Sequence, residues 1–596
     1  MKRSTVPFAM LGVGVMLVFG APDATAGPVG GSPAQGVQSD AAFAASYAAN
    51  GVRNVSATTQ RTSCYAPEVT YFAALTPADG YLDGGMSACN GAATTGEDLG
   101  PYPTQDVVHP PMRVKDHSES DIRVDPTNPL HLIGQSKWAV SAEGYNHLLG
   151  FYESFDGGLS WPLQGHVPGY EGWTDNTDPV GAFDPWGNFY SLVLPYNFYY
   201  AKSGVHRYDN GSNQTNPALP PEAVSIAVRP HGATTARDWI STHDGHPDYV
   251  VTVPNAATNV PDKQWIAIDT DPSSPHYGRV YAMWTIFVLN PSAVFVSYAD
   301  ARADGTHTDW SAPRQLPTVN GKPWDTYLLP HVAPDGTVYT TVTNNPVAKG
   351  FLYNDIYLVW SRDGGVTWNG PLLVAPNVQA PTYQNTTFRE GIVNSFAVGT
   401  TPITPAGAYP LYVTYEDGST GLSNVYLTAS VDGGRHWTAP IRVNDNAGPT
   451  EALQPRVEVA PTGTVTVVFY DRRLPCPAQD DQDAAGSGVA HDPGTAASPG
   501  TPWGRSNYCV NTAIQFYRPD LTPVGHNVRL SAHTWDPQLS ALHPGCICSQ
   551  RTFIGDYFGV ESAAGFTYTT SVSTFNHTGE NPFFHQQQIV ARVPTP

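Results

Sequence analysis

Short runs of alternating apolar and polar residues recur along most of the chain, and turn-forming residues separate them. Residues 356–360 read Ile-Tyr-Leu-Val-Trp, and residues 332–339 place Pro-Asp-Gly between two apolar stretches. A period of two residues puts alternate side chains on opposite faces of a strand, while Gly, Pro and Asp favour tight turns. The pattern therefore predicts many short β-strands and few helices.

The strand pattern is itself repeated. Units that join an apolar strand, a turn and a second, aromatic-rich strand begin near Asp121, Asp178, Lys263, Leu328, Glu390, Gln454 and Phe553. Units of about 60 to 85 residues with four short strands are typical of propeller blades, whereas a β-helix would have a much shorter repeat. We therefore expect an all-β protein: a β-propeller of six or seven four-stranded blades over residues 113–596, with seven favoured.

An eight-residue pattern, Ser-x-Asp-Gly-Gly-x-x-Trp, occurs three times. The copies contain Ser154, Asp156 and Trp161, then Ser361, Asp363 and Trp368, then Ser430, Asp432 and Trp437. In a hairpin the Ser and Asp side chains would bond the turn's own N–H groups, Gly-Gly would supply positive φ, and Trp would pack beside its strand. A carboxylate whose oxygens are occupied by hydrogen bonds within the turn is not free to react with a substrate, so we expect the motif to be structural.

The spacing of the motif supports the count of units. Asp156 and Asp363 are 207 residues apart, three times the 69 residues between Asp363 and Asp432. Two intervening units with degenerate turns are expected, and residues 294–300 leading to Trp310 are a candidate for one. Residues 479–502 read as a loop insertion. Their acidic run at 480–483 does not match an EF-hand, so a solvated loop is favoured over a Ca²⁺ site.

The N-terminal part differs from the repeats. A basic start, an apolar stretch and Ala24-Thr25-Ala26 predict a secretory signal over residues 1–26, and hence a secreted protein, extracellular or periplasmic. Residues 27–60 lack apolar periodicity and are expected to be a flexible leader. Residues 61–112 are expected to be an irregular N-terminal extension. No later segment is apolar for long enough to predict a membrane span.

Charge and cysteine content narrow the function classes. The formal net charge is −21, which disfavours nucleic acid as a partner but does not exclude a local basic pocket for an anionic sugar. Export would make disulfides available, and Cys476 with Cys509 and Cys64 with Cys89 are the expected pairs. Cys546 and Cys548 are too close for an unstrained bridge, and as half of a metal site they lack a second pair at zinc spacing. We expect a monomer.

The three Ser-x-Asp-Gly-Gly-x-x-Trp motifs resemble the Asp boxes, or BNR repeats, of the sialidase superfamily. The resemblance covers roughly residues 113–596 and implies a propeller whose Asp boxes lie away from the substrate pocket. The superfamily includes exo-sialidases, other glycoside hydrolases, polysaccharide lyases and propellers with no known chemistry, so the shared fold does not assign a reaction.

Sialidases of this kind bind the sugar carboxylate with three arginines and use a Tyr nucleophile, a Glu that activates it, and an Asp acid/base. The resemblance implies Tyr557 as nucleophile with Glu390, and Arg389 and Arg456 as anion-binding groups. The family's Arg-Ile-Pro motif is absent; Arg123, or Arg113, would have to replace its arginine. Salt bridges between blades are the alternative for the arginines, and packing between blades is the alternative for Tyr557.

Acid/base candidates stand at the starts of the first strands of the units: Asp121 and Asp178, with Asp262 as a third. His117, His331 and His543 lie close to such starts, but no His-Glu-x-x-His pattern occurs, so no metal site and no cofactor are expected. For Asp471-Arg472-Arg473 we favour an ion pair that braces neighbouring blades.

Two functions of different classes follow from these residues. The first is a secreted, sialidase-like glycoside hydrolase that acts on a carbohydrate, which could be anionic. The alternative is a non-catalytic propeller that binds glycan or protein, and a polysaccharide lyase is the third hypothesis.

Overall fold

A computed structural model describes the β-rich part of the chain and part of its N-terminal segment. The described residues are 32–48, 53–54, 116–139, 147–167, 175–196, 199–201, 213–215, 222–253, 260–287, 292–319, 325–344, 353–383, 394–403, 407–475, 507, 509–535, 537, 554–573 and 586–596. The predicted signal sequence (1–26), extension (61–112) and insertion (479–502) lie outside them, as do all cysteines except Cys509. Those predictions and the disulfide pairs therefore stay predictions.

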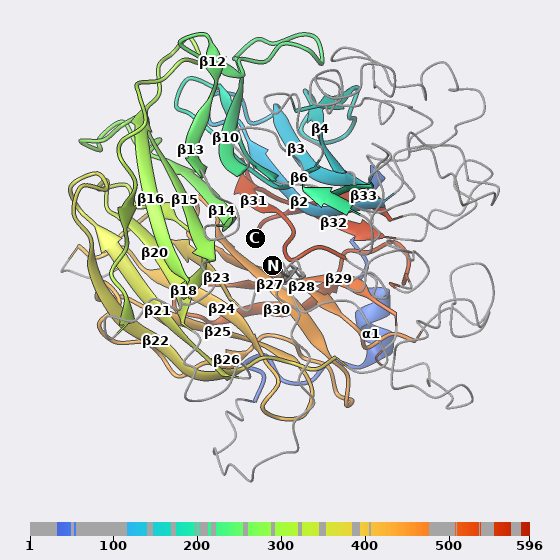
Figure 1. Cartoon of the computed structure of the whole chain (residues 1–596). Helices are drawn as coiled ribbons and strands as arrows, with labels where there is room; N and C mark the ends of the chain where they lie inside the picture. Colours follow the sequence, from blue (N-terminus) through green and yellow to red (C-terminus); the bar gives the residue numbers. More distant parts are fainter. Residues whose placement is uncertain are drawn as a thin grey trace, which may run out of the picture.

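Seven antiparallel sheets are arranged around a central axis as the blades of a propeller (Figure 1). Blade 1 contains β2 (Asp116–Val124), β3 (Leu132–Ala139), β4 (His147–Ser154) and β5 (Leu163–His166). Blade 2 contains β6 (Asp175–Phe183), β7 (Phe189–Tyr196), β10 (Glu222–Arg229) and β13 (Tyr249–Val253). Blade 3 contains β14 (Val260–Ile268), β15 (Arg279–Phe287), β16 (Ala293–Asp300) and β17 (Arg314–Gln315).

The remaining blades follow the same order. Blade 4 contains β18 (Asp325–Leu328), β19 (His331–Val332), β20 (Val338–Asn344), β21 (Tyr353–Ser361) and β22 (Asn369–Gln379). Blade 5 contains β23 (Asn394–Val398), β24 (Leu411–Asp417), β25 (Asn424–Ser430) and β26 (Ile441–Arg442). Blade 6 contains β27 (Ala452–Val459), β28 (Val465–Asp471), β29 (Asn511–Tyr517) and β30 (Pro523–Arg529). Two small hairpins, β8 (Tyr199–Ala201) with β9 (Asn213–Thr215) and β11 (Thr242–His243) with β12 (His246–Pro247), leave blade 2.

The two ends of the described chain complete blade 7 together. Its strands are β31 (Val560–Ala563), β32 (Phe566–Ser573), β33 (Gln587–Pro594) and, at the outer edge, β1 (Arg53–Asn54). Because β1 precedes every other strand in sequence but pairs with β33, the ring is closed by a segment from each end of the fold. The inner strands contact one another in order, and β31 contacts β2, so the ring has no open junction. The structure confirms the all-β, seven-bladed alternative.

Buried middle strands explain why the sequence forms blades. Every residue of β24, β25 and β28 is buried, and these strands are rich in Val, Tyr, Thr and Leu. Such residues suit a pleated strand covered on both faces by adjacent blades. The core therefore lies between the blades, while the charged residues discussed below lie on the inner strands.

The three Ser-x-Asp-Gly-Gly-x-x-Trp segments join the third and fourth strands of blades 1, 4 and 5. In the first, Ser154 Oγ donates to Asp156 Oδ1 at 2.9 Å and accepts from Gly158 N at 2.8 Å. Asp156 Oδ1 also accepts from Ser160 N at 2.9 Å, and Gly157 and Gly158 have φ of 73° and 81°. These bonds are the ones expected of a structural turn. Two blades separate the first and second copies, as the spacing predicted, and residues 294–310 form the corresponding hairpin of blade 3.

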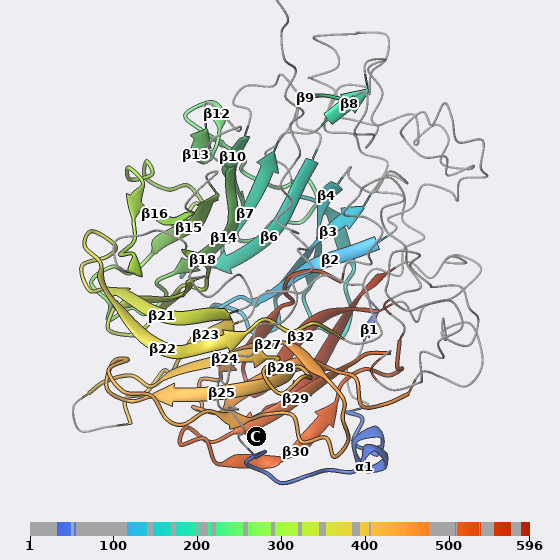
Figure 2. The same ribbon diagram turned by 60° about the horizontal axis from the view of Figure 1, so that its bottom comes forward.

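Part of the predicted flexible leader is packed on the propeller. Ser39 caps the helix α1 (Asp40–Ala45), and Phe43 on that helix is fully buried under the guanidinium of Arg473, 4.1 Å from the ring centre. Figure 2 shows α1 beside β30, which it contacts. The expectation of a flexible leader over 27–60 is therefore wrong for residues 39–46, because the sequence pattern of so short a helix was too weak to show its one buried face.

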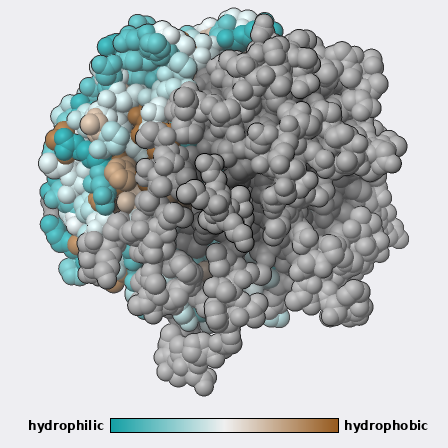
Figure 3. Space-filling view, viewed as in Figure 1, coloured by the Kyte–Doolittle hydropathy of each residue, from teal (hydrophilic) through white to brown (hydrophobic). Residues whose placement is uncertain are grey.

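The surface adds little to these features. The described surface facing the viewer in Figure 3 is mainly hydrophilic, with isolated hydrophobic residues. Within the described residues no helix has the length and apolar character needed to cross a bilayer.

Candidate functional site

Four of the inner strands carry a β-bulge built on a residue of positive φ other than glycine. Glu119, Asp178, Lys263 and Gln454 each have a positive φ between 48° and 55°, and the pairing register shifts beside each of them. A bulge re-aims a side chain and bends the strand. The repeated bulge therefore sets polar side chains of four blades around one end of the axis.

These bulges and their neighbours form one connected polar group, the axial cluster. It comprises Glu119, Lys137, Thr177, Asp178, Asp262, Lys263 and Asp556. Lys137 Nζ lies 2.8 Å from Glu119 Oε2 and donates to Thr177 Oγ1 at 2.9 Å. The Thr177 hydroxyl lies 2.6 Å from Asp178 Oδ1. Blades 1 and 2 are thereby joined through polar contacts at the axis.

Lys263 extends the cluster across the ring. Its Nζ lies 2.7 Å from Asp556 Oδ2, 3.5 Å from Asp178 Oδ2 and 3.7 Å from Asp262 Oδ1. Lys263 belongs to blade 3 and Asp556 immediately precedes the inner strand of blade 7, so the two are not on adjacent blades. Their contact places the cluster on the axis itself.

Two carboxyl groups of the cluster have pKa values displaced in opposite directions. Burial, and then the negative charge of Asp178, raise the pKa of Glu119 to about 8. Burial opposes ionisation of Asp178 as well, but Lys263 and Lys137 hold its pKa below the usual value. At neutral pH Glu119 therefore keeps its proton while Asp178 is ionised.

Asp262 is the accessible carboxyl group of the cluster. Its side chain is 30% exposed, against 0% for Glu119 and 5% for Asp178. Partial burial of its carboxyl group, and then repulsion from Asp178 and Asp556, raise the pKa of Asp262, although Lys263 opposes this. An accessible carboxyl group that holds its proton more tightly than usual is suited to donating that proton to a ligand.

A second group of ionisable side chains lies further along the inner strands, and its members in blades 1 and 6 stand two and four residues beyond the bulge residues. It comprises Asp121, Arg123, His331, Arg456, Glu458 and Glu561, from blades 1, 4, 6 and 7. Burial and the carboxylate of Glu458 raise the pKa of Glu561 to about 8. Burial and the positive charges of Arg123 and Arg456 lower the pKa of His331 to about 3, so its imidazole is neutral.

Arg456 differs from the other buried arginines of the described chain. It is 6% exposed, its guanidinium lies 4.7 Å from the centre of the Trp265 ring, and Nε and Nη1 have no hydrogen-bond partner among the described residues. Burial, and then repulsion from Arg123, lower its pKa to about 10. The inter-blade salt bridge, which was the alternative for Arg456, is not formed with any described residue.

Asp121 and Arg123 form an ion pair that braces blades. Arg123 Nη2 lies 3.0 Å from Asp121 Oδ1, and Arg123 Nη1 lies 3.4 Å from Glu561 Oε2 on blade 7. Asp121 Oδ2 accepts from Gly181 N on blade 2 at 2.7 Å. Since both side chains are engaged in this way, the geometry does not favour Asp121 as the acid/base or Arg123 as a free anion-binding group.

The phenol of Tyr557 is packed at the axis. Its hydroxyl donates to the carbonyl of Pro179 at 3.0 Å, and its ring meets Trp265 edge to face at 5.2 Å. Burial and the carboxylates of Asp178 and Glu119 raise the pKa of Tyr557 well above its usual value. A nucleophilic tyrosine needs its phenolate stabilised, so this environment favours the packing alternative over the predicted nucleophile.

The glycines beside Tyr557 serve close contact between blades. A Cβ on Gly555 would lie 2.5 Å from Glu119 N, and a Cβ on Gly559 would lie 2.5 Å from Ile122 N. Only glycine lets the segment before β31 approach β2 so closely.

Other predicted residues are only partly tested. Arg389, Glu390, Arg113 and His543 lie outside the described residues, as does the side chain of His117. Arg473 contacts Asp471 at 2.8 Å and, across to the segment after β26 of blade 5, Asp445 at 2.8 Å. The expected ion pair between neighbouring blades is therefore present.

Glu119, Lys137 and Asp556 were not singled out from the sequence. The available signal was weak: Glu119, Asp178, Lys263 and Gln454 are polar residues at equivalent places in four units. Left-handed backbone is uncommon for residues other than glycine, so the pattern gave no reason to expect bulges there.

No family model matches the chain, and no curated protein matches it. Solved structures do resemble it. A protein of unknown function from Dyadobacter fermentans is 11% identical with a TM-score of 0.38, and the match covers 81% of this chain and 96% of that one. The intramolecular trans-sialidase from Ruminococcus gnavus is 10% identical with a TM-score of 0.38, covering 60% and 90%. The polysaccharide lyase Uly1 is 11% identical with a TM-score of 0.40, covering 81% and 90%. Likenesses this weak carry no argument about activity, and the propeller fold rests on the strand pairing itself.

Proposed function

We propose that the protein is an exported, carbohydrate-active enzyme of the glycoside hydrolase class, and that its reaction takes place at the axial cluster. The observation that carries this proposal is the placement of Asp262, an accessible carboxyl group with a raised pKa, within a buried set of carboxylates and lysines on the axis. The resemblance of the three hairpin motifs to those of sialidases agrees with it.

In the proposed reaction Asp262 donates a proton to the leaving oxygen of a glycosidic bond, and a water molecule forms the new bond to the anomeric carbon. The water gives up its proton to solvent and Asp262 is reprotonated, so the products are the freed alcohol and a sugar hemiacetal. Lys263, which contacts Asp178, Asp262 and Asp556, holds the carboxyl groups in place and keeps Asp178 ionised. Glu119 Oε2 and Asp178 Oδ1 both contact the Thr177 hydroxyl, at 3.1 Å and 2.6 Å, and both side chains are buried. They act as a positioning pair beneath Asp262.

Arg456 indicates which class of carbohydrate the proposed site would prefer. A buried guanidinium whose charge no described carboxylate neutralises by direct contact is suited to a carboxylate or sulfate of a sugar. We therefore propose an acidic carbohydrate as substrate.

The experiment is a screen of the purified protein against fluorogenic glycosides and acidic polysaccharides, followed by Asp262→Asn on the best substrate. General acid catalysis contributes about 10²- to 10⁴-fold, so we expect Asp262→Asn to lower kcat by at least about 100-fold. Asp520→Asn is the matched control, because Asp520 is exposed and accepts a hydrogen bond from the backbone N–H of the turn residue Thr522. Full activity in Asp262→Asn would overturn the role of Asp262.

A second comparison tests the substrate class. Arg456→Ala is expected to weaken binding of the acidic substrate at least about tenfold, on the order of 1.4 kcal/mol, and to leave a neutral analogue unaffected. An equal effect on both would show that Arg456 acts only by packing on Trp265. Reducing ends without an unsaturated product indicate hydrolysis, an unsaturated product indicates a lyase, and binding without turnover indicates a non-catalytic propeller.

A further inference from the structure

A separate group of metal-ligand side chains lies at the periphery of blades 2 and 3, away from the axial cluster. His243 stands on the β11–β12 hairpin, Asp248 immediately precedes β13, and His307 stands on the hairpin that follows β16. One potential ligand atom of each lies within 4.8 Å of those of the other two. Two blades thus bring two imidazoles and one carboxylate together.

The local backbone accounts for how these side chains meet. Asp244 and Gly245 both have positive φ, 50° and 80°, as the tight turn between β11 and β12 requires, and the turn places His243 at the hairpin end. In blade 3 the hairpin is longer than the Ser-x-Asp-Gly-Gly-x-x-Trp turns of blades 1, 4 and 5. The extra residues of this longer hairpin include His307 and Asp309.

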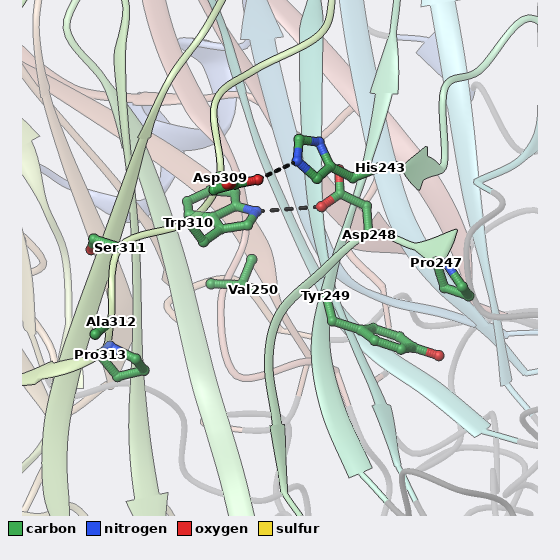
Figure 4. A pocket seen from close by; sticks show the side chains of 10 residues that line it. All are labelled: His243, Pro247, Asp248, Tyr249, Val250, Asp309, Trp310, Ser311, Ala312 and Pro313. Carbon is green, nitrogen blue, oxygen red and sulfur yellow. Dashed lines mark hydrogen bonds and ion pairs between the residues drawn. The ribbon is translucent and has the colours of Figure 1, made fainter. Parts of the chain in front are cut away.

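The outer contacts of the group are those that orient metal ligands. His307 Nδ1 lies 2.7 Å from the carbonyl of Thr308 and donates to it. His307 Nε2 lies 2.7 Å from Asp248 Oδ2 and donates to it, so a metal ion bound at Nε2 would take the place of that proton. Trp310 Nε1 donates to Asp248 Oδ1 at 3.4 Å (Figure 4). A backbone carbonyl on one imidazole nitrogen and an N–H on the carboxylate are typical second contacts of bound metals.

The group also faces open space. A cavity of about 460 Å³ is lined by His243, Asp248, Tyr249, Asp309 and Trp310, with prolines at its edge (Figure 4). His243 Nε2 lies 2.8 Å from Asp309 Oδ1, whose side chain is 88% exposed. Three protein ligands with a fourth side open to a cavity are the arrangement of metal sites that accept an outside ligand.

We propose that His243, Asp248 and His307 bind a divalent transition metal ion of the zinc type, with the open coordination position facing this cavity. Two imidazole nitrogens and one carboxylate suit zinc and disfavour calcium, which takes oxygen ligands. Tetrahedral zinc places its ligand atoms about 3.3 Å apart. The His243 ring is stacked on the His307 ring, with an interplanar angle of 8° and ring centres 4.9 Å apart, so His243 has to turn out of this stack before both imidazoles point at one ion. The ion would fasten the β11–β12 hairpin of blade 2 to the long hairpin of blade 3.

The test is titration of the chelator-treated protein with Zn²⁺ by calorimetry, and with Co²⁺ by visible spectroscopy. We expect one ion per chain and, for Co²⁺, the absorption of a nitrogen- and oxygen-ligated site. His243→Ala is expected to weaken Zn²⁺ binding at least tenfold and to remove the Co²⁺ band. Its side chain is 25% exposed and its removal leaves the Asp248–His307 pair in place, so this variant should fold.

His436→Ala is the matched control. His436 lies 2.6 Å from Asp432 on the hairpin of blade 5, where the two form an exposed His–Asp pair that no third ligand joins within the described part of the chain. Its removal should leave Zn²⁺ binding unchanged. The proposal is overturned if the wild-type protein shows no saturable Zn²⁺ binding, if His243→Ala binds as the wild type does, or if Ca²⁺ displaces Zn²⁺ at equal concentration.

Discussion

At the scale of single residues, the chemical type of a side chain does not by itself show whether that side chain can take part in catalysis. Tyr557 and Asp121 have the chemistry of catalytic groups, but one donates to a backbone carbonyl and the other holds an arginine and an amide of the next blade. Glu119 is fully buried and still titratable near neutral pH. Desolvation and neighbouring charges, not residue type, decide which of these groups can exchange a proton.

The raised pKa of Glu119 makes stability depend on pH. A carboxyl group with a raised folded pKa binds its proton more tightly when folded, so its contribution is complete below its ordinary pKa of 4.5 and is lost as the pH rises to about 8. We expect the free energy of unfolding to fall more steeply between about pH 5 and pH 8 in the wild type than in Glu119→Gln. Urea unfolding across this range measures both slopes.

The comparison isolates Glu119 because Glu561, whose pKa is also raised to about 8, is present in both proteins. The lowered pKa of Asp178 changes stability only at more acidic pH. Parallel slopes in the two proteins would show that Glu119 does not hold its proton as described.

At the scale of elements, hairpins and bulges have different tasks. The Ser-x-Asp-Gly-Gly-x-x-Trp hairpins use their carboxylates within the turn, and the pKa values of Asp363 and Asp432 are lowered to about 2 even though burial opposes this, because turn donors bond them. The bulges of the inner strands instead direct polar residues toward one another. The hairpins stabilise the outer blade, and the bulges build the candidate site.

Trp368 provides a test of the hairpin's structural role. It packs against the core between blades and donates through Nε1 to Gly365 O at 3.1 Å. Because the ring is only partly buried, Trp368→Ala is expected to lower the free energy of unfolding by about 2 to 4 kcal/mol. Turnover per folded molecule should stay the same. Val431→Ala, at an exposed hairpin position, should change stability by less than about 0.5 kcal/mol; an equal effect of both substitutions would contradict the assignment.

At the scale of the whole molecule, both ends of the fold stabilise the ring. The N-terminal segment contributes β1 to blade 7 and packs α1 at blade 6. Gln38 also bridges to Asn446, beyond the outer strand of blade 5. The N-terminal part before the blades is therefore a structural component of the propeller.

Phe43 tests this attachment. It is fully buried and stacked under Arg473, so Phe43→Ala is expected to cost about 3 to 5 kcal/mol and to lower the Tm. Val37→Ala is the control, since Val37 is 58% exposed in the same segment. If calorimetry gives the two variants the same Tm as the wild type, the segment does not hold the ring together.

The sequence alone determined the features that depend on neighbouring residues. Alternation with period two and turn chemistry predicted strands and hairpins. The repeat and its spacing predicted six or seven blades and favoured seven, because each blade must bury the same kind of strand. The sequence also predicted that Asp471-Arg472-Arg473 forms an ion pair between neighbouring blades, because oppositely charged residues stand together at the end of a strand.

Only the tertiary structure decided which side chains meet. Lys263 and Asp556 are 293 positions apart and touch because the ring closes around them. The bulges occur at residues other than glycine, so local preference did not reveal them. Burial and contacts between blades produce the packed state of Tyr557 and the position of the outer histidines. They also leave Arg456 Nε and Nη1 without a hydrogen-bond partner among the described residues. These properties arise only in the assembled ring, because the side chains lose contact with water and come together only once distant strands have packed.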